Sequence, residues 1–198
     1  SPGLYEVILD KHNINCQLTT TKRVGIHQYE FSDTANQPSI IIDLEHRDQL
    51  LDWEIALTGK NEISGRRVSR SWAEEQHFYF CMQFSSEMDV IFNKEDRPTK
   101  VFVKLKGLNQ GKVLVKVGIS TVNQENAKEN LIIEASSWDF KNYVTSSEKN
   151  WEKELSKIDF LILIIFSRAK LCCVNTFVLT DCKMYFFITS TFTQITKV

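Results

Sequence analysis

The feature that most constrains the fold of this chain is a series of ten short runs of β-forming residues in its first two thirds. Each run is rich in Val, Ile, Phe and Tyr and ends at Asn, Asp, Gly or Pro, which is typical of strands joined by turns. Turn signals about every eight to twelve residues favour an antiparallel β-sandwich over a parallel sheet. The predicted strands are 4–9, 14–20, 23–31, 39–44, 53–58, 63–69, 77–84, 89–92, 101–105 and 113–119.

The last predicted strand leads into a first predicted helix over about 122–133. Val113, Val115 and Val117 occupy alternate positions, which is typical of a strand with a fully buried face. Thr121, three residues before Gln124, has the form of a capping box, in which a hydroxyl and an amide satisfy backbone donors at a helix start.

A second predicted helix carries one apolar stripe, with Lys and Glu on its other side. The stripe must dock on the sandwich or on a domain outside this chain, and Trp138 and Trp151 are predicted packing anchors. The predicted units are therefore a sandwich at 1–119, linker helices at 120–158 and a tail at 159–198. The stripe consists of Phe140, Val144, Trp151, Leu155 and Ile158.

The composition limits the partners of the chain. Lys and Arg number 24 against 25 for Asp and Glu, giving a net charge of -1 without a basic run, so nucleic acid is not an expected partner. The chain opens without the basic and apolar segments of a signal peptide. Its five cysteines show no spacing that indicates a disulfide framework.

Trp72 is the candidate for a substrate-binding side chain. An indole offers a flat apolar face to the C–H side of a sugar ring and an N–H to a hydroxyl. Arg67, Arg70 and Glu74 are close in sequence and are able to hydrogen-bond sugar hydroxyls. The alternative, which we favour from the sequence, is a tryptophan packed at the edge of the sandwich or against a domain outside this chain.

The carboxylates do not form an evident acid and base pair. Glu74 and Glu75 are adjacent, so on a strand they would point to opposite faces, and in a loop they would be solvated. We therefore predict no catalytic residue.

One acidic stretch has the ligand types that calcium prefers. Asp43, Glu45 and Asp48, with His46 between them, supply carboxylate oxygens. An ordinary surface turn after the 39–44 strand explains them better, so we predict no metal site here.

His77 and Cys81 are residue types that can bind zinc, and a cysteine can also act as a nucleophile. His77 and Cys81 are four apart on one predicted strand, but no further ligand lies nearby, so a core histidine and a core thiol are the better interpretation. His27, also on a strand, is interpreted as a hydrogen-bonded structural residue. Cys172 and Cys173 are read as a chance pair in the tail.

Three stretches of the chain resemble glycoside hydrolase family 92, the calcium-dependent α-mannosidases. The family has an Arg-Val-Gly-x-His-x-Tyr-x-Phe strand, matched by Arg23, Val24, Gly25, His27, Tyr29 and Phe31. A second signature is matched by Ile63, Gly65, Arg67, Val68, Ser69, Trp72, Ala73, Tyr79, Phe80 and Phe84. The passage from strand to helices over 113–158 is the third, so the resemblance covers about residues 1–158.

The resemblance implies a mainly β fold: an antiparallel β-sandwich of the supersandwich, galactose-mutarotase-like kind, followed by two linker α-helices that join a catalytic helical barrel. It also implies an exo-acting, inverting enzyme that removes mannose from glycans with the help of calcium, in a parent that is secreted or periplasmic. Inverting glycosidases use an acid and a base about 6.5 to 9.5 Å apart. The family places them in barrel motifs of the Gly-Asn-Glu-Pro-x-His and Gly-Asn-Asp kinds, which this chain lacks.

Two functions stay open at this point. The chain is either a fragment of an α-mannosidase, supplying the sandwich and linker without the acid and base, or a non-catalytic carbohydrate-binding β-sandwich. The tail at 159–198 departs from the family pattern, and our hypothesis is an out-of-frame translation. Its apolar run 160–166 is shorter than the roughly 20 residues that span a bilayer, so a membrane span is not expected.

Overall fold

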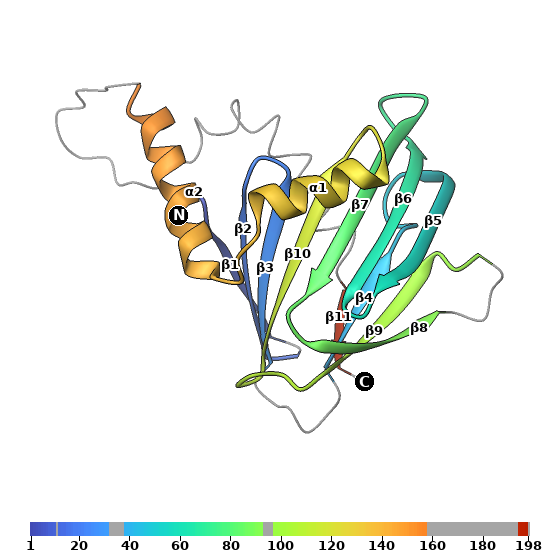
Figure 1. Cartoon of the computed structure of the whole chain (residues 1–198), viewed down its shortest axis with the longest axis horizontal. Helices are drawn as coiled ribbons and strands as arrows, with labels where there is room; N and C mark the ends of the chain where they lie inside the picture. The colour runs from blue at the N-terminus through green and yellow to red at the C-terminus, as the bar shows by residue number, and fades with distance from the viewer. Residues whose placement is uncertain (11, 32–37, 93–96, 158–193, 198) are drawn as a thin grey trace.

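The computed structural model describes residues 1–10, 12–31, 38–92, 97–157 and 194–197, which form two antiparallel sheets with two helices outside them (Figure 1). The strands are β1 (Tyr5–Leu9), β2 (Ile14–Thr20), β3 (Val24–Phe31), β4 (Pro38–Asp43), β5 (Gln49–Gly59), β6 (Glu62–Arg70), β7 (Gln76–Phe84), β8 (Glu87–Phe92), β9 (Lys100–Lys106), β10 (Lys112–Ser120) and β11 (Gln194–Lys197). The larger sheet has the order β1-β2-β3-β10-β7-β6-β5 and the smaller β11-β4-β9-β8.

The two sheets enclose one main core. Side chains on alternate positions of each sheet point inward, as the sandwich prediction requires, and close packing of these two inner faces removes them from water. The core includes Ile63, Phe80, Phe84, Val113 and Val115 from the larger sheet and Ile40, Ile42, Val101, Val103 and Leu105 from the smaller sheet. The predicted mainly β, antiparallel sandwich followed by two helices is confirmed.

Each of the ten predicted strands is present, and their ends differ mainly at β5. This strand begins at Gln49 rather than at Trp53, because its pairing with β6 shifts register between Leu50 and Asp52 and interrupts the apolar alternation. The predicted strand at 89–92 likewise begins earlier, at Glu87. The tail interpretation falls mostly on residues outside the described part of the chain and stays a prediction.

The first helix, α1 (Gln124–Glu134), lies on the outer face of the larger sheet, over β10 and β7 (Figure 1). Its contact is unusually close because Gly118 presents no side chain. A Cβ at Gly118 would lie 2.4 Å from the carbonyl oxygen of Ala127 and 2.8 Å from Cβ of Leu131. Ala127 and Leu131 are themselves fully buried, so the helix backbone rests almost directly on the strand.

The predicted capping box at the start of α1 is wrong. The N-cap is Asn123, whose side-chain oxygen accepts a hydrogen bond of 2.8 Å from the backbone N–H of Asn126. Thr121 lies two residues before this cap. Asparagine is among the best N-cap residues, so it competes successfully with the Thr121–Gln124 pattern.

Lys116 of β10 binds the carboxyl end of α1. It is 2% exposed on β10, and its Nζ donates a 2.6 Å hydrogen bond to the carbonyl oxygen of Ala135, the C-cap residue. The same Nζ lies 3.8 Å from the centre of the Trp138 ring. Burial lowers the pKa of Lys116 to about 8. A cation is thus supplied to a helix end whose own last turn has no basic residue.

Two carboxylates tie α1 to the sheet at its sides. Glu134 accepts hydrogen bonds from the Thr21 hydroxyl at 2.6 Å and the Arg23 backbone N–H at 2.9 Å. Burial raises the pKa of Glu134, but these hydrogen bonds outweigh burial and lower it overall. Lys128 pairs with the mostly buried Glu62 of β6 at 2.8 Å.

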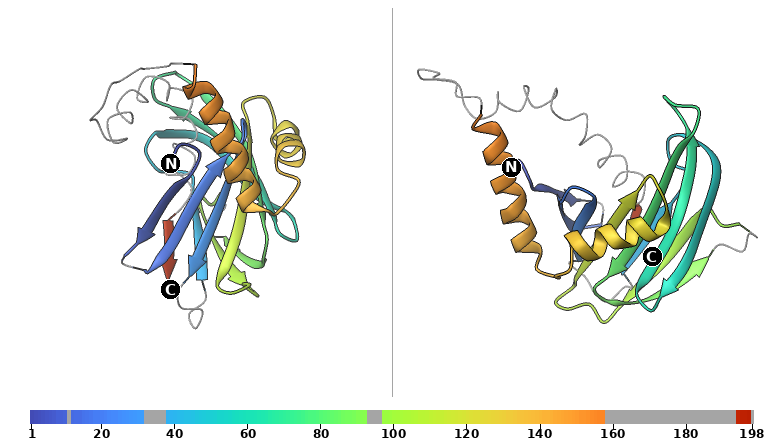
Figure 2. Two further views of the ribbon diagram at one scale, coloured as in Figure 1. Left: turned by 90° about the vertical axis from the view of Figure 1, so that its left-hand side faces the viewer. Right: turned by 45° about the horizontal axis from the view of Figure 1, so that its top comes forward.

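The second helix, α2 (Phe140–Leu155), packs on β2 and β3 at the edge of the larger sheet, as the two views in Figure 2 show. Its buried residues are Tyr143 and Ser147, and Phe140 packs half-buried beside Tyr143. The predicted stripe is therefore only partly correct: Trp151 and Leu155 are half-buried rather than anchored. Tyr143 is the main buried aromatic residue of α2, and its hydroxyl bonds to Ser137 in the segment between the two helices.

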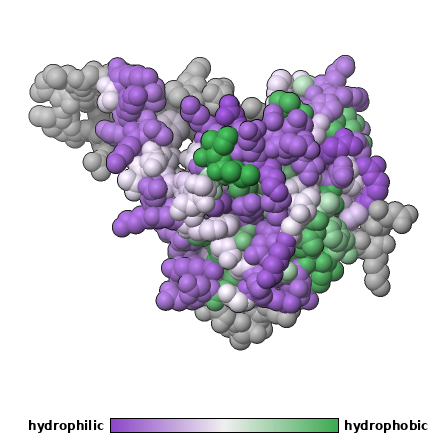
Figure 3. Space-filling model, in the orientation of Figure 1, coloured by the Kyte–Doolittle hydropathy of each residue, from purple (hydrophilic) through white to green (hydrophobic). Residues whose placement is uncertain are grey.

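Apolar side chains are also exposed on the outer surface of α1. Ile132 is 56% and Ile133 is 70% exposed, and a hydrophobic patch over the carboxyl half of α1 is visible in Figure 3. Neither helix in the described ranges has the length and apolar character needed to cross a bilayer.

Candidate functional site

Trp72 lies at the tip of the β6–β7 hairpin and is 86% exposed. The turn beneath it is closed by a 3.1 Å hydrogen bond from the backbone N–H of Ser71 to the carbonyl of Ala73. Arg70 Nε donates to the carbonyl of Glu74 at 3.3 Å and stiffens the same turn. Packing at the edge of the sandwich is therefore wrong for Trp72, and its indole faces are free of the described residues for contact with a ligand or another domain.

Arg67, one of the predicted neighbours of Trp72, is a structural residue. Its guanidinium is buried and donates to the carbonyl oxygens of Leu44 at 2.8 Å and His46 at 3.3 Å, with Asp48 at 3.8 Å. Burial lowers the pKa of Arg67, and the charge of Asp48 partly opposes this. The group fastens the loop after β4 to the larger sheet and is not available to a sugar.

The acidic loop after β4 has its carboxylates occupied. Lys100 Nζ lies 3.3 Å from Asp43 and 3.4 Å from Glu45, and the Thr99 hydroxyl donates to Glu45 at 3.0 Å. Asp48 faces the buried arginine. Ordinary ion pairs explain this loop, in agreement with the surface-turn interpretation, and no cluster of three or more potential metal ligands occurs among the residues described.

His77 and Cys81 do not form a pair, because four residues of strand separate their Cα atoms by about 13 Å. Cys81 is fully buried under Ala127 and Leu131 of α1, and burial raises the pKa of its thiol. His77 is exposed, and its Nε2 lies 3.0 Å from the Glu75 carboxylate. The core interpretation is thus correct for the thiol and wrong for the histidine.

His27 is a buried structural histidine, as predicted. Its Nδ1 lies 2.8 Å from the Tyr29 hydroxyl, and its buried Nε2 has no hydrogen-bond partner among the described residues. Burial lowers the pKa of His27 to about 4, so it is neutral at physiological pH.

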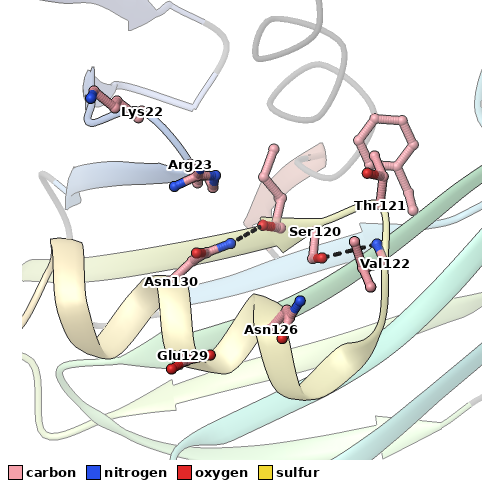
Figure 4. A pocket seen from close by; sticks show the side chains of 10 residues that line it. Lys22, Arg23, Ser120, Thr121, Val122, Asn126, Glu129 and Asn130 are labelled. Carbon is pink, nitrogen blue, oxygen red and sulfur yellow. Dashed lines mark hydrogen bonds between the residues drawn. The ribbon is translucent and has the colours of Figure 1, made fainter.

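A hollow of about 720 Å³ opens beside the start of α1 (Figure 4). Strand register places it at the same end of the larger sheet as Trp72, since Ser120 of β10 pairs with Tyr79 near the start of β7. No local pattern predicts this hollow, although the i, i+3, i+4 spacing of Asn126, Glu129 and Asn130 indicates one polar helix face. Its lining residues are Lys22, Arg23, Phe78, Ile119, Ser120, Thr121, Val122, Asn126, Glu129 and Asn130.

The sequence comparison assigns a family to this fold. Residues 1–120 match the profile described as the glycosyl hydrolase family 92 N-terminal domain, which is most of the described sandwich. The chain belongs to this family. No curated protein sequence matches the chain.

Solved structures of family 92 enzymes share the fold. The α-mannosidase BT3965 from Bacteroides thetaiotaomicron superposes with a TM-score of 0.68 at 22% identity, over 79% of this chain and 24% of that one. The inverting mannosidase BT2199 from Bacteroides thetaiotaomicron VPI-5482 gives 0.59 at 16% identity, over 80% and 23%. The glycosyl hydrolase ccman5 gives 0.63 at 18% identity, over 72% and 21%. The chain thus spans about a quarter of the length of these relatives.

The family 92 signature positions have structural roles here that are visible in the contacts. A Cβ at Gly65 would lie 2.1 Å from the carbonyl oxygen of Glu54 and 2.8 Å from Cζ of Phe80. Arg67 fastens the β4 loop, and His27 and Tyr29 bond to each other. Among the residues that match the two strand signatures, Trp72 is the one whose large apolar side chain is exposed.

Proposed function

We propose that this chain supplies the N-terminal sandwich and linker helices of an exo-acting α-mannosidase that removes mannose from glycans. The match of residues 1–120 to the family 92 N-terminal domain carries this proposal. The structural relatives include an inverting mannosidase, and one α-mannosidase structure contains mannoimidazole. The general acid, the general base and the calcium site would belong to a helical barrel domain outside this chain, in a parent that is secreted or periplasmic.

Within this function, Trp72 is the proposed sugar-contacting residue. A free indole face at a hairpin tip is suited to the apolar side of a pyranose ring, and the short turn below it limits its movement. Arg70 and Glu74 flank it, whereas the buried Arg67 is withdrawn from the site.

The outer surface of α1 is the proposed contact with the barrel domain. Ile132 and Ile133 form an exposed hydrophobic patch, and such patches often mark interaction surfaces. The sequence pattern placed this surface on α2 instead, around Phe140, Val144, Trp151 and Leu155, which are half-buried.

The alternative is a carbohydrate-binding sandwich that acts without chemistry, and the exposure of Trp72 favours it equally. Self-association or binding of a hydrophobic dye at α1, reduced in Ile133→Ser, supports the enzyme fragment. A monomer that binds no dye but binds an α-mannoside supports the module.

The test of both combines an activity assay with a binding assay on the purified chain. We expect no calcium-dependent release of mannose, because the residues that we assign to catalysis lie elsewhere. We expect methyl α-mannoside to shift the amide signals of the Trp72 hairpin in the ¹⁵N-labelled chain, a shift that Trp72→Ala removes and Trp72→Phe retains in part. Calcium-dependent release of mannose by this chain alone would refute the division of roles, and hairpin signals that shift to the same extent in Trp72→Ala would refute the role of Trp72.

A further inference from the structure

We propose that the hollow beside α1 is a second saccharide-binding recess, separate from Trp72 and suited to a neutral sugar ring. The inference rests on the proposed glycan-related function and adds a site to it. Its volume of about 720 Å³ lies within the range of about 300 to 1,000 Å³ typical of small-molecule sites.

Polar groups of α1 form one wall of the recess. Asn130 Nδ2 donates a 2.9 Å hydrogen bond to the carbonyl of Ile119, which fixes the amide and leaves its Oδ1 as an oriented acceptor (Figure 4). Asn126 lies one turn earlier, and its side-chain amide makes no hydrogen bond within the described ranges. Glu129, between them in sequence, likewise has an unpaired carboxylate in the part of the chain that is described.

Apolar side chains form the opposing surface. Phe78 and Ile119 extend from the end of the sandwich core, and Val122 stands 66% exposed above the first turn of α1. An apolar surface facing paired amide groups matches a sugar ring, which has C–H faces and hydroxyl edges.

The charges at the rim favour a neutral ligand over an anion. Arg23 is engaged by Glu134 at 3.3 Å, so among the lining residues Lys22 is the cation without a described ion pair, and Glu129 is the one carboxylate. A phosphate or carboxylate would therefore meet a carboxylate as well as a cation, which reduces its binding.

The site can be tested by nuclear magnetic resonance with ¹⁵N-labelled chain and methyl α-mannoside as the probe. We expect the side-chain amide signals of Asn126 and Asn130 to shift on titration, and to shift equally in Trp72→Ala. Asn126→Ala should weaken this binding by roughly 3- to 10-fold, the effect of one hydrogen bond. Glu125→Gln, an exposed change on α1 that does not line the recess, is the matched control and should leave the affinity unchanged.

The other outcomes show whether the recess, the proposed function or both are wrong. Shifts confined to the Trp72 hairpin would overturn the recess and leave the proposed function standing, whereas a folded chain without any shift would count against both. Equal shifts with glycerol, or unchanged affinity in Asn126→Ala, would also overturn the recess. Val122→Ser, outside the helix, supplies a second variant if Asn126→Ala does not fold.

Discussion

The two helices of this chain are attached to the same sheet by different means. α1 lies with its backbone against Gly118 and is tied down by Lys116, Glu134 and Lys128. α2 is held along its first half through Tyr143 and Ser147, and its last turn is partly exposed. Yet α2 has the clear apolar stripe and α1 has apolar residues on two sides. Close backbone contact and polar ties thus anchor the helix that lacks a single apolar stripe, and we expect them to hold α1 more firmly than the stripe holds α2.

The largest expected loss of stability is at Gly118, where α1 packs against β10. Gly118→Ala places a methyl group 2.4 Å from the Ala127 carbonyl, so the helix must move away from β10. We expect a loss of about 3 kcal/mol in the free energy of unfolding, measured by urea denaturation. Gly59→Ala is the control, because its nearest neighbour, Cβ of Glu62, lies 3.2 Å away. Equal losses in both variants would show that α1 is not seated as described.

The junction between the helices should respond to alkaline pH through Lys116. The pKa of Lys116 is lowered from 10.5 to about 8 in the fold, so the unfolded chain binds more protons between these values. Stability therefore rises as the pH increases from 8 to 10.5, by up to about 3 kcal/mol for this group. Urea denaturation across this range should show the rise in the parent chain.

Lys116→Met keeps the apolar stem and removes the titrating group, so its stability should lack this part of the pH dependence. Lys116→Arg keeps a permanent charge and should lack it too. A pH dependence identical in all three chains would assign the titration to other groups.

Sequence reasoning predicted the strands well because alternation is a local property. All ten predicted strands and both predicted helices are present, although β5 and β8 begin earlier than predicted and β11 was not predicted, since each predicted element depends on neighbouring residues and nearby turn signals. It also identified Cys81 as a core thiol, but it assigned His77 to the core, where the structure has an exposed side chain.

The sites were harder to predict because they depend on contacts between distant segments. Arg67 looked like a partner of Trp72, yet it turns inward to Leu44, 23 residues away in sequence. Likewise, the recess brings the β2–β3 turn together with the start of α1, about a hundred residues later. Periodicity in the sequence does not predict contacts between segments so far apart.

A smaller loss of stability is expected at Gly3, where the start of the chain contacts α2. Gly3 has φ of +94°, and a Cβ there would lie 2.9 Å from the backbone nitrogen of Glu148. Gly3→Ala should therefore cost about 1 to 2 kcal/mol through strain and displacement of the chain start. Gly107→Ala, with φ of +59° and no heavy atom within 4 Å, isolates the strain alone. A larger loss in Gly107→Ala than in Gly3→Ala would contradict the contact with α2.

The smallest effect should come from the hydroxyl that joins α2 to the turn before it. Tyr143 accepts a 2.9 Å hydrogen bond from the Ser137 backbone N–H and donates one of 2.9 Å to the Ser137 carbonyl. Tyr143→Phe removes both bonds and keeps the ring in its apolar contact with Val24 and Ile26. We expect a loss of about 1 kcal/mol, with faster amide exchange in α2 than in α1, measured by mass spectrometry. Faster exchange in both helices to the same degree would show that the two are held as one unit, and the distinction between them would then be wrong.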